Sequence, residues 1–87
     1  MTSEAPVDGN ALGGALMELF GREMTDARTC CEGCGAIRPV GALWVYDRAP
    51  GAVVRCPGCD NVIIVVVQRP SGRRFHFVSL RWIESTS

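Results

Sequence analysis

The spacing of apolar residues near the start of the chain predicts a helix. Four of them recur at steps of three and four residues, which places them on one helical face: Leu12, Leu16, Leu19 and Phe20. Asp8 or Asn10 can cap the first turn, and Gly21 is suited to end the last one. We therefore expect a helix over about residues 9–21, after a disordered leader over residues 1–8.

The middle of the chain has the pattern of a β-hairpin. Residues 42–46 and 52–55 are short runs rich in aromatic and β-branched side chains, as strands are. Between them, residues 47–51 contain the Pro-Gly pair that is typical of a turn. The returning strand of this hairpin leads directly into Cys56.

The last third of the chain predicts two more strands. Residues 62–67 are a continuous run of Val and Ile, which indicates a strand with both faces covered. After a Pro-Ser-Gly turn, residues 73–80 alternate, with Phe75 and Phe77 on one face, and residues 81–83 continue that strand. The helix is expected to cover one face of this mostly antiparallel sheet.

Two Cys-x-x-Cys pairs flank the predicted hairpin. Cys31 and Cys34 form the first pair, Cys56 and Cys59 form the second, and 21 residues separate the pairs. A spacer of two residues lets both sulfurs of a pair face the same side of a tight turn, so two such turns can enclose one metal ion. These four cysteines are therefore the predicted metal ligands.

Zinc is the expected metal because four thiolates satisfy its tetrahedral preference. Such a site has no open position for water or substrate, so it stabilises a fold rather than catalysing hydrolysis. The polar, acidic start of the chain lacks the features of an export signal, and no apolar run approaches the ~20 residues of a membrane helix. We therefore expect a cytoplasmic protein, and in a reducing compartment paired cysteines favour a metal over a disulfide.

Iron is the alternative metal, because four thiolates also form the electron-transfer site of rubredoxin-like proteins. Gly35, directly after the first pair, fits that pattern, whereas Asp60 follows the second pair. A glycine at this position lets the backbone approach the sulfur, and a nearby carboxylate disfavours the reduced, more negative iron centre. Both arguments favour zinc.

Cys30 and His76 are expected to lie outside the metal site. Choosing Cys30 in place of Cys31 would give a three-residue spacer, unlike that of the second pair. We interpret Cys30 as a spare, partly buried thiol, with a redox role as the alternative. His76 is the only histidine and lies 17 residues beyond the last cysteine, and four cysteines already fill the site.

Charge is balanced overall but unevenly distributed. The net charge is −4 over residues 1–35 and +4 over residues 36–87. Four arginines that are interleaved with aromatic residues could bind phosphates beside stacked bases: Arg69, Arg73, Arg74 and Arg81. The neutral total charge favours instead aromatics in the core and arginines at a solvated edge. Nucleic acid is therefore kept as an alternative partner.

The motifs Cys31-x-x-Cys34-Gly35 and Cys56-Pro57-x-Cys59 resemble those of the zinc-ribbon superfamily. With residues 8–12 and 49–51, the whole chain looks like a small bacterial zinc-ribbon family of unknown function, a resemblance that implies no activity. We expect one small α+β domain over residues 9–84, a zinc ribbon with an extended β-hairpin and the N-terminal helix on its sheet. A polar tail over residues 85–87 follows.

The sequence contains no Ser-His-Asp set, paired-carboxylate motif or Gly-rich phosphate loop, so we expect no catalytic residues and no enzyme activity. The many apolar residues of so short a chain leave sheet surface for another protein or a second copy. The predicted function is therefore a non-enzymatic protein whose structural zinc supports a protein–protein interaction surface. An accessory subunit of a larger enzyme is one form of that prediction.

Overall fold

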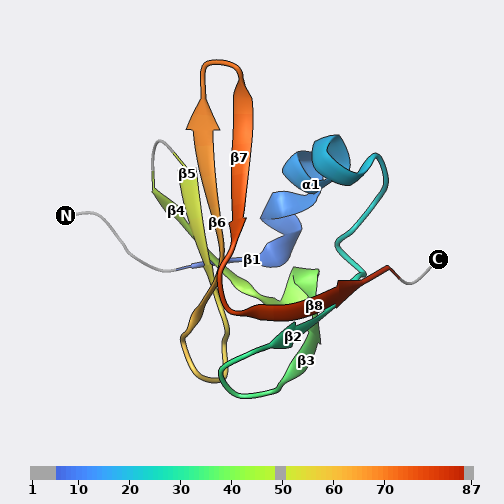
Figure 1. Cartoon of the computed structure of the whole chain (residues 1–87), viewed down its shortest axis with the longest axis vertical. Coiled ribbons are helices and arrows are strands. Elements are labelled where there is room, and N and C mark those ends of the chain that lie inside the picture. The colour runs from blue at the N-terminus through green and yellow to red at the C-terminus, as the bar shows by residue number, and fades with distance from the viewer. Residues whose placement is uncertain (1–5, 49–50, 86–87) are drawn as a thin grey trace.

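The computed structural model describes residues 6–48 and 51–85, which form two antiparallel sheets and one helical segment (Figure 1). The larger sheet has the strand order β1-β4-β5-β6-β7, with β1 Val7–Asp8, β4 Trp44–Arg48, β5 Gly51–Arg55, β6 Val62–Arg69 and β7 Gly72–Phe77. The smaller sheet has the order β3-β2-β8, with β3 Ile37–Pro39, β2 Arg28–Cys31 and β8 Leu80–Glu84. The prediction of a small, mostly antiparallel protein with one helical segment is confirmed.

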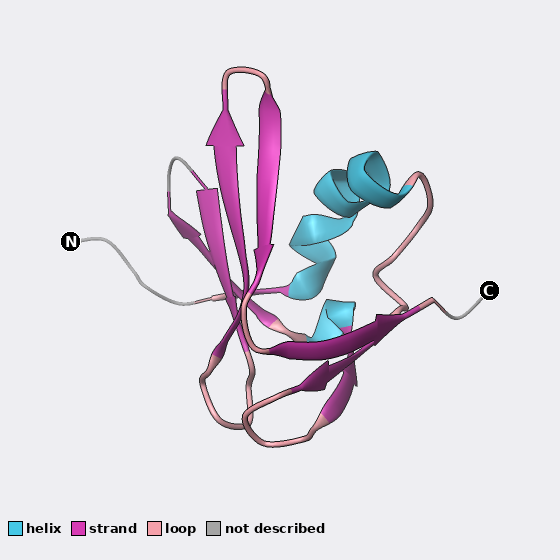
Figure 2. Cartoon of the chain, viewed as in Figure 1, coloured by secondary structure: helices cyan, strands magenta, loops and turns pink. Residues whose placement is uncertain are grey.

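The helical segment lies beside one face of the larger sheet (Figures 1 and 2). It begins with a 3-10 turn, η1 (Gly9–Leu12), and continues as α1 (Gly13–Phe20). The side chain of Asp8 accepts a hydrogen bond from the N–H of Asn10 (3.1 Å). Gly21 ends the helix in the left-handed conformation, with a φ of 74°. The predicted boundaries and both predicted end signals therefore agree with the structure.

The first strand lies in the segment that the sequence assigned to a disordered leader. Val7 and Asp8 pair with Val45 and Trp44 of β4 in an antiparallel register, so the predicted leader over residues 1–8 is too long. The sequence did not indicate this strand because Asp disfavours strands, and the pairing depends on a distant part of the chain. The rest of the predicted leader, residues 1–5, and the tail residues 86 and 87 lie outside the described residues.

The hydrophobic core lies between the helical segment and the larger sheet and continues to the smaller sheet. Its most deeply buried aliphatic side chains come from the helix and from the central part of the chain: Leu16, Val40, Leu43, Val54, Ile63 and Ile64. Val40 belongs to a second 3-10 turn, η2 (Val40–Ala42), which precedes β4. Cys31 and Cys56 are buried in the same cluster. The core therefore reaches the two cysteine turns.

The C-terminal segment differs from the predicted single strand over residues 73–83. Its two halves, β7 and β8, belong to different sheets. Two backbone hydrogen bonds fix the crossing: the N–H of Val78 donates to the carbonyl oxygen of Ile63 (2.8 Å), and the N–H of Glu32 donates to that of Ser79 (2.7 Å). Apolar and polar residues alternate in the same way along one long strand and along two short consecutive strands. The sequence therefore did not show that the chain leaves one sheet and enters the other.

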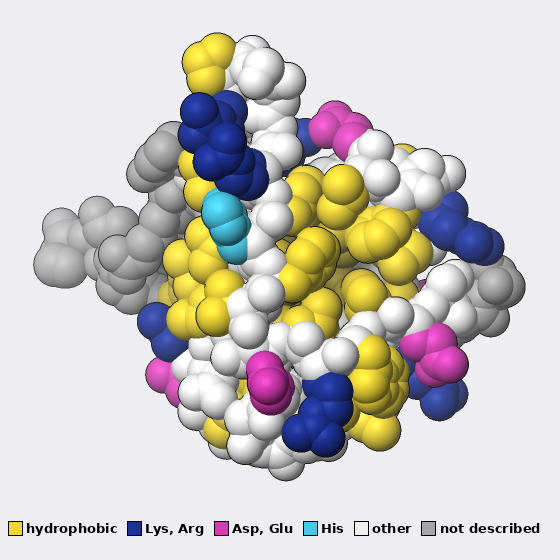
Figure 3. Space-filling view, viewed as in Figure 1, with side chains coloured by type: hydrophobic (Ala, Val, Ile, Leu, Met, Phe, Trp, Pro, Cys, Tyr) yellow, Lys and Arg dark blue, Asp and Glu magenta, His cyan; other side chains and the backbone are white. Residues whose placement is uncertain are grey.

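The two faces of the Val and Ile run of β6 differ in burial. Ile64 and Val66 are buried in the core, whereas Val65 and Val67 point to the opposite face and are only partly buried. No described helix or strand lies over that face (Figure 1). Figure 3 shows hydrophobic side chains at the surface beside the histidine, His76. Within the described residues the chain itself therefore covers only one face of this strand, and coverage of the other face by a partner stays a prediction.

Candidate metal centre

The first cysteine pair lies in the turn between β2 and β3. Two backbone hydrogen bonds close this turn: the N–H of Cys31 donates to the carbonyl oxygen of Ala36 (3.0 Å), and the N–H of Gly35 donates to that of Cys31 (2.8 Å). Gly35 has a φ of 76°, a left-handed conformation that glycine adopts at little cost. The chain can therefore reverse within a few residues of the strand that positions Cys31.

The second pair lies between β5 and β6 in a turn with the same hydrogen bonds. The N–H of Cys56 donates to the carbonyl oxygen of Asn61 (2.9 Å), and the N–H of Asp60 donates to that of Cys56 (2.8 Å). Asp60 has a φ of 66°, so it occupies the same left-handed conformation as Gly35. Asp60 therefore changes the charge at this position but not the backbone path. The absence of a glycine at this position therefore does not change the backbone conformation of the turn, and the argument from the carboxylate is unaffected.

Two glycines let the turns approach each other. A Cβ atom on Gly33 would lie 1.7 Å from Nδ2 of Asn61 and 3.4 Å from Sγ of Cys59, both in the opposite turn. A Cβ atom on Gly58 would lie 2.9 Å from Nη2 of Arg38, which comes from β3. Side chains at either glycine would therefore force the turns or their neighbours to move.

The two turns bring four sulfur atoms together. The Sγ atoms of Cys31 and Cys59 are 3.6 Å apart, those of Cys34 and Cys56 are 3.7 Å apart, and all four lie within 4.8 Å of one another. A tetrahedral site with metal–sulfur bonds of about 2.3 Å has sulfur–sulfur edges of about 3.8 Å. The four cysteines could therefore hold one metal ion, with one pair of sulfurs from a turn of each sheet.

Four thiolates at this spacing repel one another strongly when no cation lies between them. Burial opposes ionisation of Cys56, but the N–H groups of Cys59 and Gly58 and the neighbouring thiols outweigh it and lower the Cys56 pKa to about 6. The N–H of Asn61 favours the thiolate of Cys59, but desolvation and the three neighbouring thiols raise the Cys59 pKa to about 12. The two pKa values shift in opposite directions because one sulfur is stabilised as a thiolate while its neighbour stays protonated. A divalent metal would neutralise the negative charge of the cluster.

Two arginines bring positive charge to the second turn. Nη2 of Arg38 lies next to Gly58, and its Nε is buried with no hydrogen-bond partner in the part of the chain that is described. Nη1 of Arg55 donates to the carbonyl oxygen of Asp60 (2.8 Å) and lies 3.8 Å from its carboxylate. Four thiolates and a divalent metal carry about two net negative charges, so these guanidinium groups suit the site. Arg55 directly precedes Cys56 in the sequence, whereas Arg38 comes to the second turn only through the fold.

The structure keeps Cys30 and His76 out of the sulfur cluster. Cys30 is buried, and its thiol lies 3.8 Å from the carbonyl oxygen of Gly35 and 3.9 Å from that of Cys31. His76 lies on β7 opposite Val65, on the uncovered face of the larger sheet. Neither side chain belongs to the group of described residues that could hold a metal.

The four arginines considered for nucleic-acid binding do not form one surface. Arg73 pairs with Glu18 of α1 on the helix-facing side of the sheet, whereas its neighbour Arg74 points to the opposite face. Arg69 ends β6 at the β6–β7 turn, and Arg81 lies in β8 of the smaller sheet. The predicted patch is therefore divided between two sheets and two faces.

A family model described as a family of unknown function, DUF6510, matches residues 2–87. No curated protein and no solved structure matches the chain. None of the helices in residues 6–48 and 51–85 has the length and apolar character needed to cross a bilayer. The arrangement of the four cysteines is therefore the basis for assigning this site.

Proposed function

Since this chain belongs to the DUF6510 family, for which no function is known, we propose from its own geometry that it is a non-enzymatic zinc-ribbon protein. One structural zinc ion supports a protein-binding face of the larger sheet. The observation that carries the proposal is the position of four clustered sulfurs between two sheets. Four thiolates complete a tetrahedral coordination sphere, which leaves no position for water or substrate. The ion therefore acts as a structural link.

Zinc suits this position because it has no redox chemistry and accepts a fixed tetrahedral geometry. Cys31 and Cys34 come from a turn of the smaller sheet, and Cys56 and Cys59 come from a turn of the larger sheet. Binding of the ion fixes the distance between the two sheets. A reducing, cytoplasmic location belongs to the proposal because it keeps the cysteines available as ligands.

Metal analysis of protein purified without added metal tests this part of the proposal. We expect one zinc per chain, no visible absorption, and a melting temperature that falls on chelation and recovers when zinc is added back. Folded protein that contains no metal, with unfolding unaffected by a chelator, would contradict the proposal.

Iron electron transfer is the second candidate, and the backbone of the second turn favours it. Asp60 adopts the conformation of Gly35, so the two turns can offer equivalent N–H groups to the sulfurs. Arg55 also lies beside the Asp60 carboxylate, which reduces the electrostatic penalty on a reduced iron centre. Coloured protein that bleaches reversibly on reduction would replace zinc with iron in the proposal.

The protein-binding surface is the uncovered face of the larger sheet, which we call the valine face. It has an aliphatic centre, aromatic side chains from β4 and basic side chains from β5 and β7: Val53, Val65, Val67, Trp44, Tyr46, Arg55, Arg74 and His76. Trp44 is 41% exposed, and the three valines are partly buried. An apolar face of this kind on a small soluble domain is typical of an interaction site.

The partner that fits the valine face is a protein with an apolar centre and an acidic rim. Arg55, Arg74 and His76 surround the valines, while Asp60 is the acidic residue that lies beside Arg55. Two copies packed face to face would place these basic groups near each other, whereas an acidic rim would neutralise them. The aromatic side chains of this face, Trp44 and Tyr46, both lie on β4 at one side of the aliphatic centre, so we favour a protein over single-stranded nucleic acid, which stacks successive bases on aromatic side chains.

Photo-crosslinking from Val65 tests the valine face in the native host. The matched control carries the same photoreactive residue at Met17, which is exposed on α1. We expect the photoreactive residue at position 65 to give one discrete protein adduct and the residue at position 17 to give none. Replacement of both Arg55 and Arg74 by Glu should reduce the amount of the position 65 adduct. Ultracentrifugation should show a monomer. A dimer that is lost in V65D would identify a second copy as the occupant, and equal adducts from both positions would contradict a specific face.

A further inference from the structure

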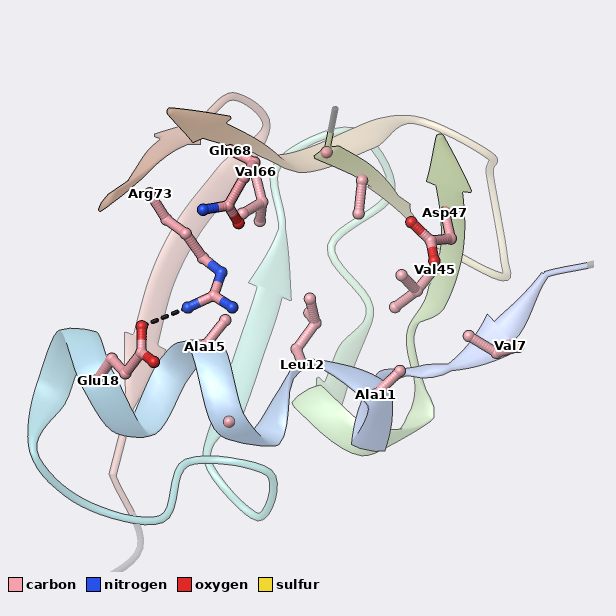
Figure 4. Close-up of a pocket in the computed structure, with 13 residues that line it drawn as sticks. Val7, Ala11, Leu12, Ala15, Glu18, Val45, Asp47, Val66, Gln68 and Arg73 are labelled. Carbon is pink, nitrogen blue, oxygen red and sulfur yellow. Dashed lines mark hydrogen bonds and ion pairs between the residues drawn. The ribbon is translucent and has the colours of Figure 1, made fainter. Parts of the chain in front are cut away.

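A cavity lies between the helical segment and the helix-facing side of the larger sheet (Figure 4). Its volume is about 540 Å³, within the range of about 300–1,000 Å³ that is usual for small-molecule sites. It is separate from the cysteine turns and from the valine face, because its lining comes from η1, α1 and the other side of the sheet. Neither the metal site nor the protein-binding face accounts for it.

The cavity exists because the residues that face each other across it are small. Ala11, Gly14 and Ala15 line the helical wall, and Gly51 and Ala52 line the sheet opposite. An ideal Cβ atom on Gly14 would meet no atom within 4 Å, so the space beside this residue is open. Helices that cover a sheet usually fill such space with larger aliphatic side chains.

Aliphatic side chains form part of the cavity wall beside the amide of Gln68, and the charged groups lie at its two sides (Figure 4). Val45 and Val66 contribute aliphatic surface from β4 and β6. At one margin, Arg73 of β7 pairs with Glu18 of α1, as the dashed line in Figure 4 shows. This pair spans from the sheet to the helix and closes that side of the cavity with no net charge.

Asp47 supplies the charge that decides which ligand fits. Its side chain lies at the β4 side of the cavity, away from the Glu18–Arg73 pair (Figure 4). Among the side chains that the structure describes, which do not include that of Arg48, none forms a hydrogen bond or ion pair with the side chain of Asp47. The guanidinium of Arg73 is already neutralised by Glu18, so the described lining residues carry one uncompensated negative charge. An anion would meet that charge with no free cationic partner among these residues.

We infer that this cavity binds a small ligand with an apolar body and a protonated amine. The apolar body contacts Val45, Ala52 and Val66, and the carboxylate of Asp47 is the counter-ion of the amine. Burial of the body in a concave apolar site provides most of the binding free energy, and the charge pair sets the orientation and the preference for a cation.

Three probes with the same hydrocarbon chain test the inference on the full-length, metal-loaded protein: hexylamine, hexanol and hexanoate. Binding is followed by amide chemical shifts in NMR spectra. We expect hexylamine to bind most tightly and hexanoate least, with the largest shifts at Val45, Ala52 and Val66. The D47N variant should lower hexylamine affinity by about fivefold and leave hexanol unchanged, because an exposed ion pair contributes this much.

Two neighbouring glycines provide a matched pair of variants. Gly14→Leu adds a large side chain to a residue that lines the cavity and should abolish binding of all three probes. Gly13→Leu is the control, because Gly13 does not line the cavity and its Cβ would make only one ordinary contact, 3.6 Å from Thr25. Tightest binding of hexanoate, unchanged hexylamine affinity in D47N, shifts confined to other surfaces, or binding retained by folded G14L would each overturn the inference.

Discussion

The adjacent cysteines of β2 allow the role of the metal to be tested by one chemical change at two neighbouring positions. Cys30 and Cys31 are both buried, but only the sulfur of Cys31 belongs to the four-sulfur cluster. Replacement of either by Ser removes one sulfur and keeps a side chain of similar size. A structural metal predicts that Cys31→Ser damages the fold and that Cys30→Ser is tolerated.

The expected magnitudes differ clearly. Structural zinc sites contribute about 10–16 kcal/mol of apparent binding free energy, while an 87-residue domain has a total stability of about 4–13 kcal/mol. Replacing a residue that hydrogen-bonds to a metal ligand costs up to ~3 kcal/mol of metal-binding free energy. Removing one of the four ligands should cost more than this. In contrast, the hydroxyl group introduced by Cys30→Ser could donate to the carbonyl oxygen of Gly35, which now lies 3.8 Å from the Cys30 thiol. This change should cost about 1–2 kcal/mol.

Denaturant unfolding with excess zinc and with a chelator measures both effects. Wild type and C30S should each lose most of their stability on chelation, whereas C31S should be unstable in zinc and insensitive to the chelator. Metal content should follow the same order. Equal stability of C30S and C31S, or a large chelator effect on C31S, would refute the assignment of Cys31 as a ligand.

Three further predictions use the same unfolding assay or a metal-release assay. Gly35→Ala should destabilise by about 1 kcal/mol and Asp60→Gly should stabilise by up to about 1 kcal/mol, because both positions have left-handed backbones; a loss of stability in D60G would contradict this. Gly9→Ala should cost about 1–3 kcal/mol, because its Cβ would lie 1.8 Å from a backbone oxygen, whereas Gly14→Ala should stabilise α1 by up to about 1 kcal/mol. Arg38→Met should speed zinc transfer to a chromogenic chelator by about tenfold, and an unchanged rate would show that this guanidinium does not support the metal.

The sulfur cluster could be predicted from the sequence because its information is local. Each Cys-x-x-Cys pair specifies one turn, and Gly35 marks the left-handed residue that ends the first turn. Asp60 occupies the equivalent position of the second turn, which composition alone did not show because Asp adopts this conformation less often than Gly. The helix was predictable for the same reason, since its cap at Asp8 and its end at Gly21 act within a few residues.

The two-sheet architecture could not be predicted because it depends on contacts between distant segments. β2 pairs with β8 through residues that are 49 to 56 positions apart in the sequence, and β1 pairs with β4. The surroundings of residues 62–67 could not be predicted for a related reason. An all-aliphatic strand is usual where both faces are buried, and here Val65 and Val67 are apolar although no described element covers them.

The proposed zinc link explains how so short a chain can leave one sheet face uncovered. A domain of this size buries only about 60–65% of its unfolded surface, and its helical segment covers one face of the larger sheet alone. The smaller sheet meets the larger one at the cysteine turns, so an ion at this junction would stabilise their contact without apolar surface. Aliphatic side chains on the other face are then not needed to complete the core. Their presence at Val53, Val65 and Val67 fits the proposed binding surface better than a role in folding.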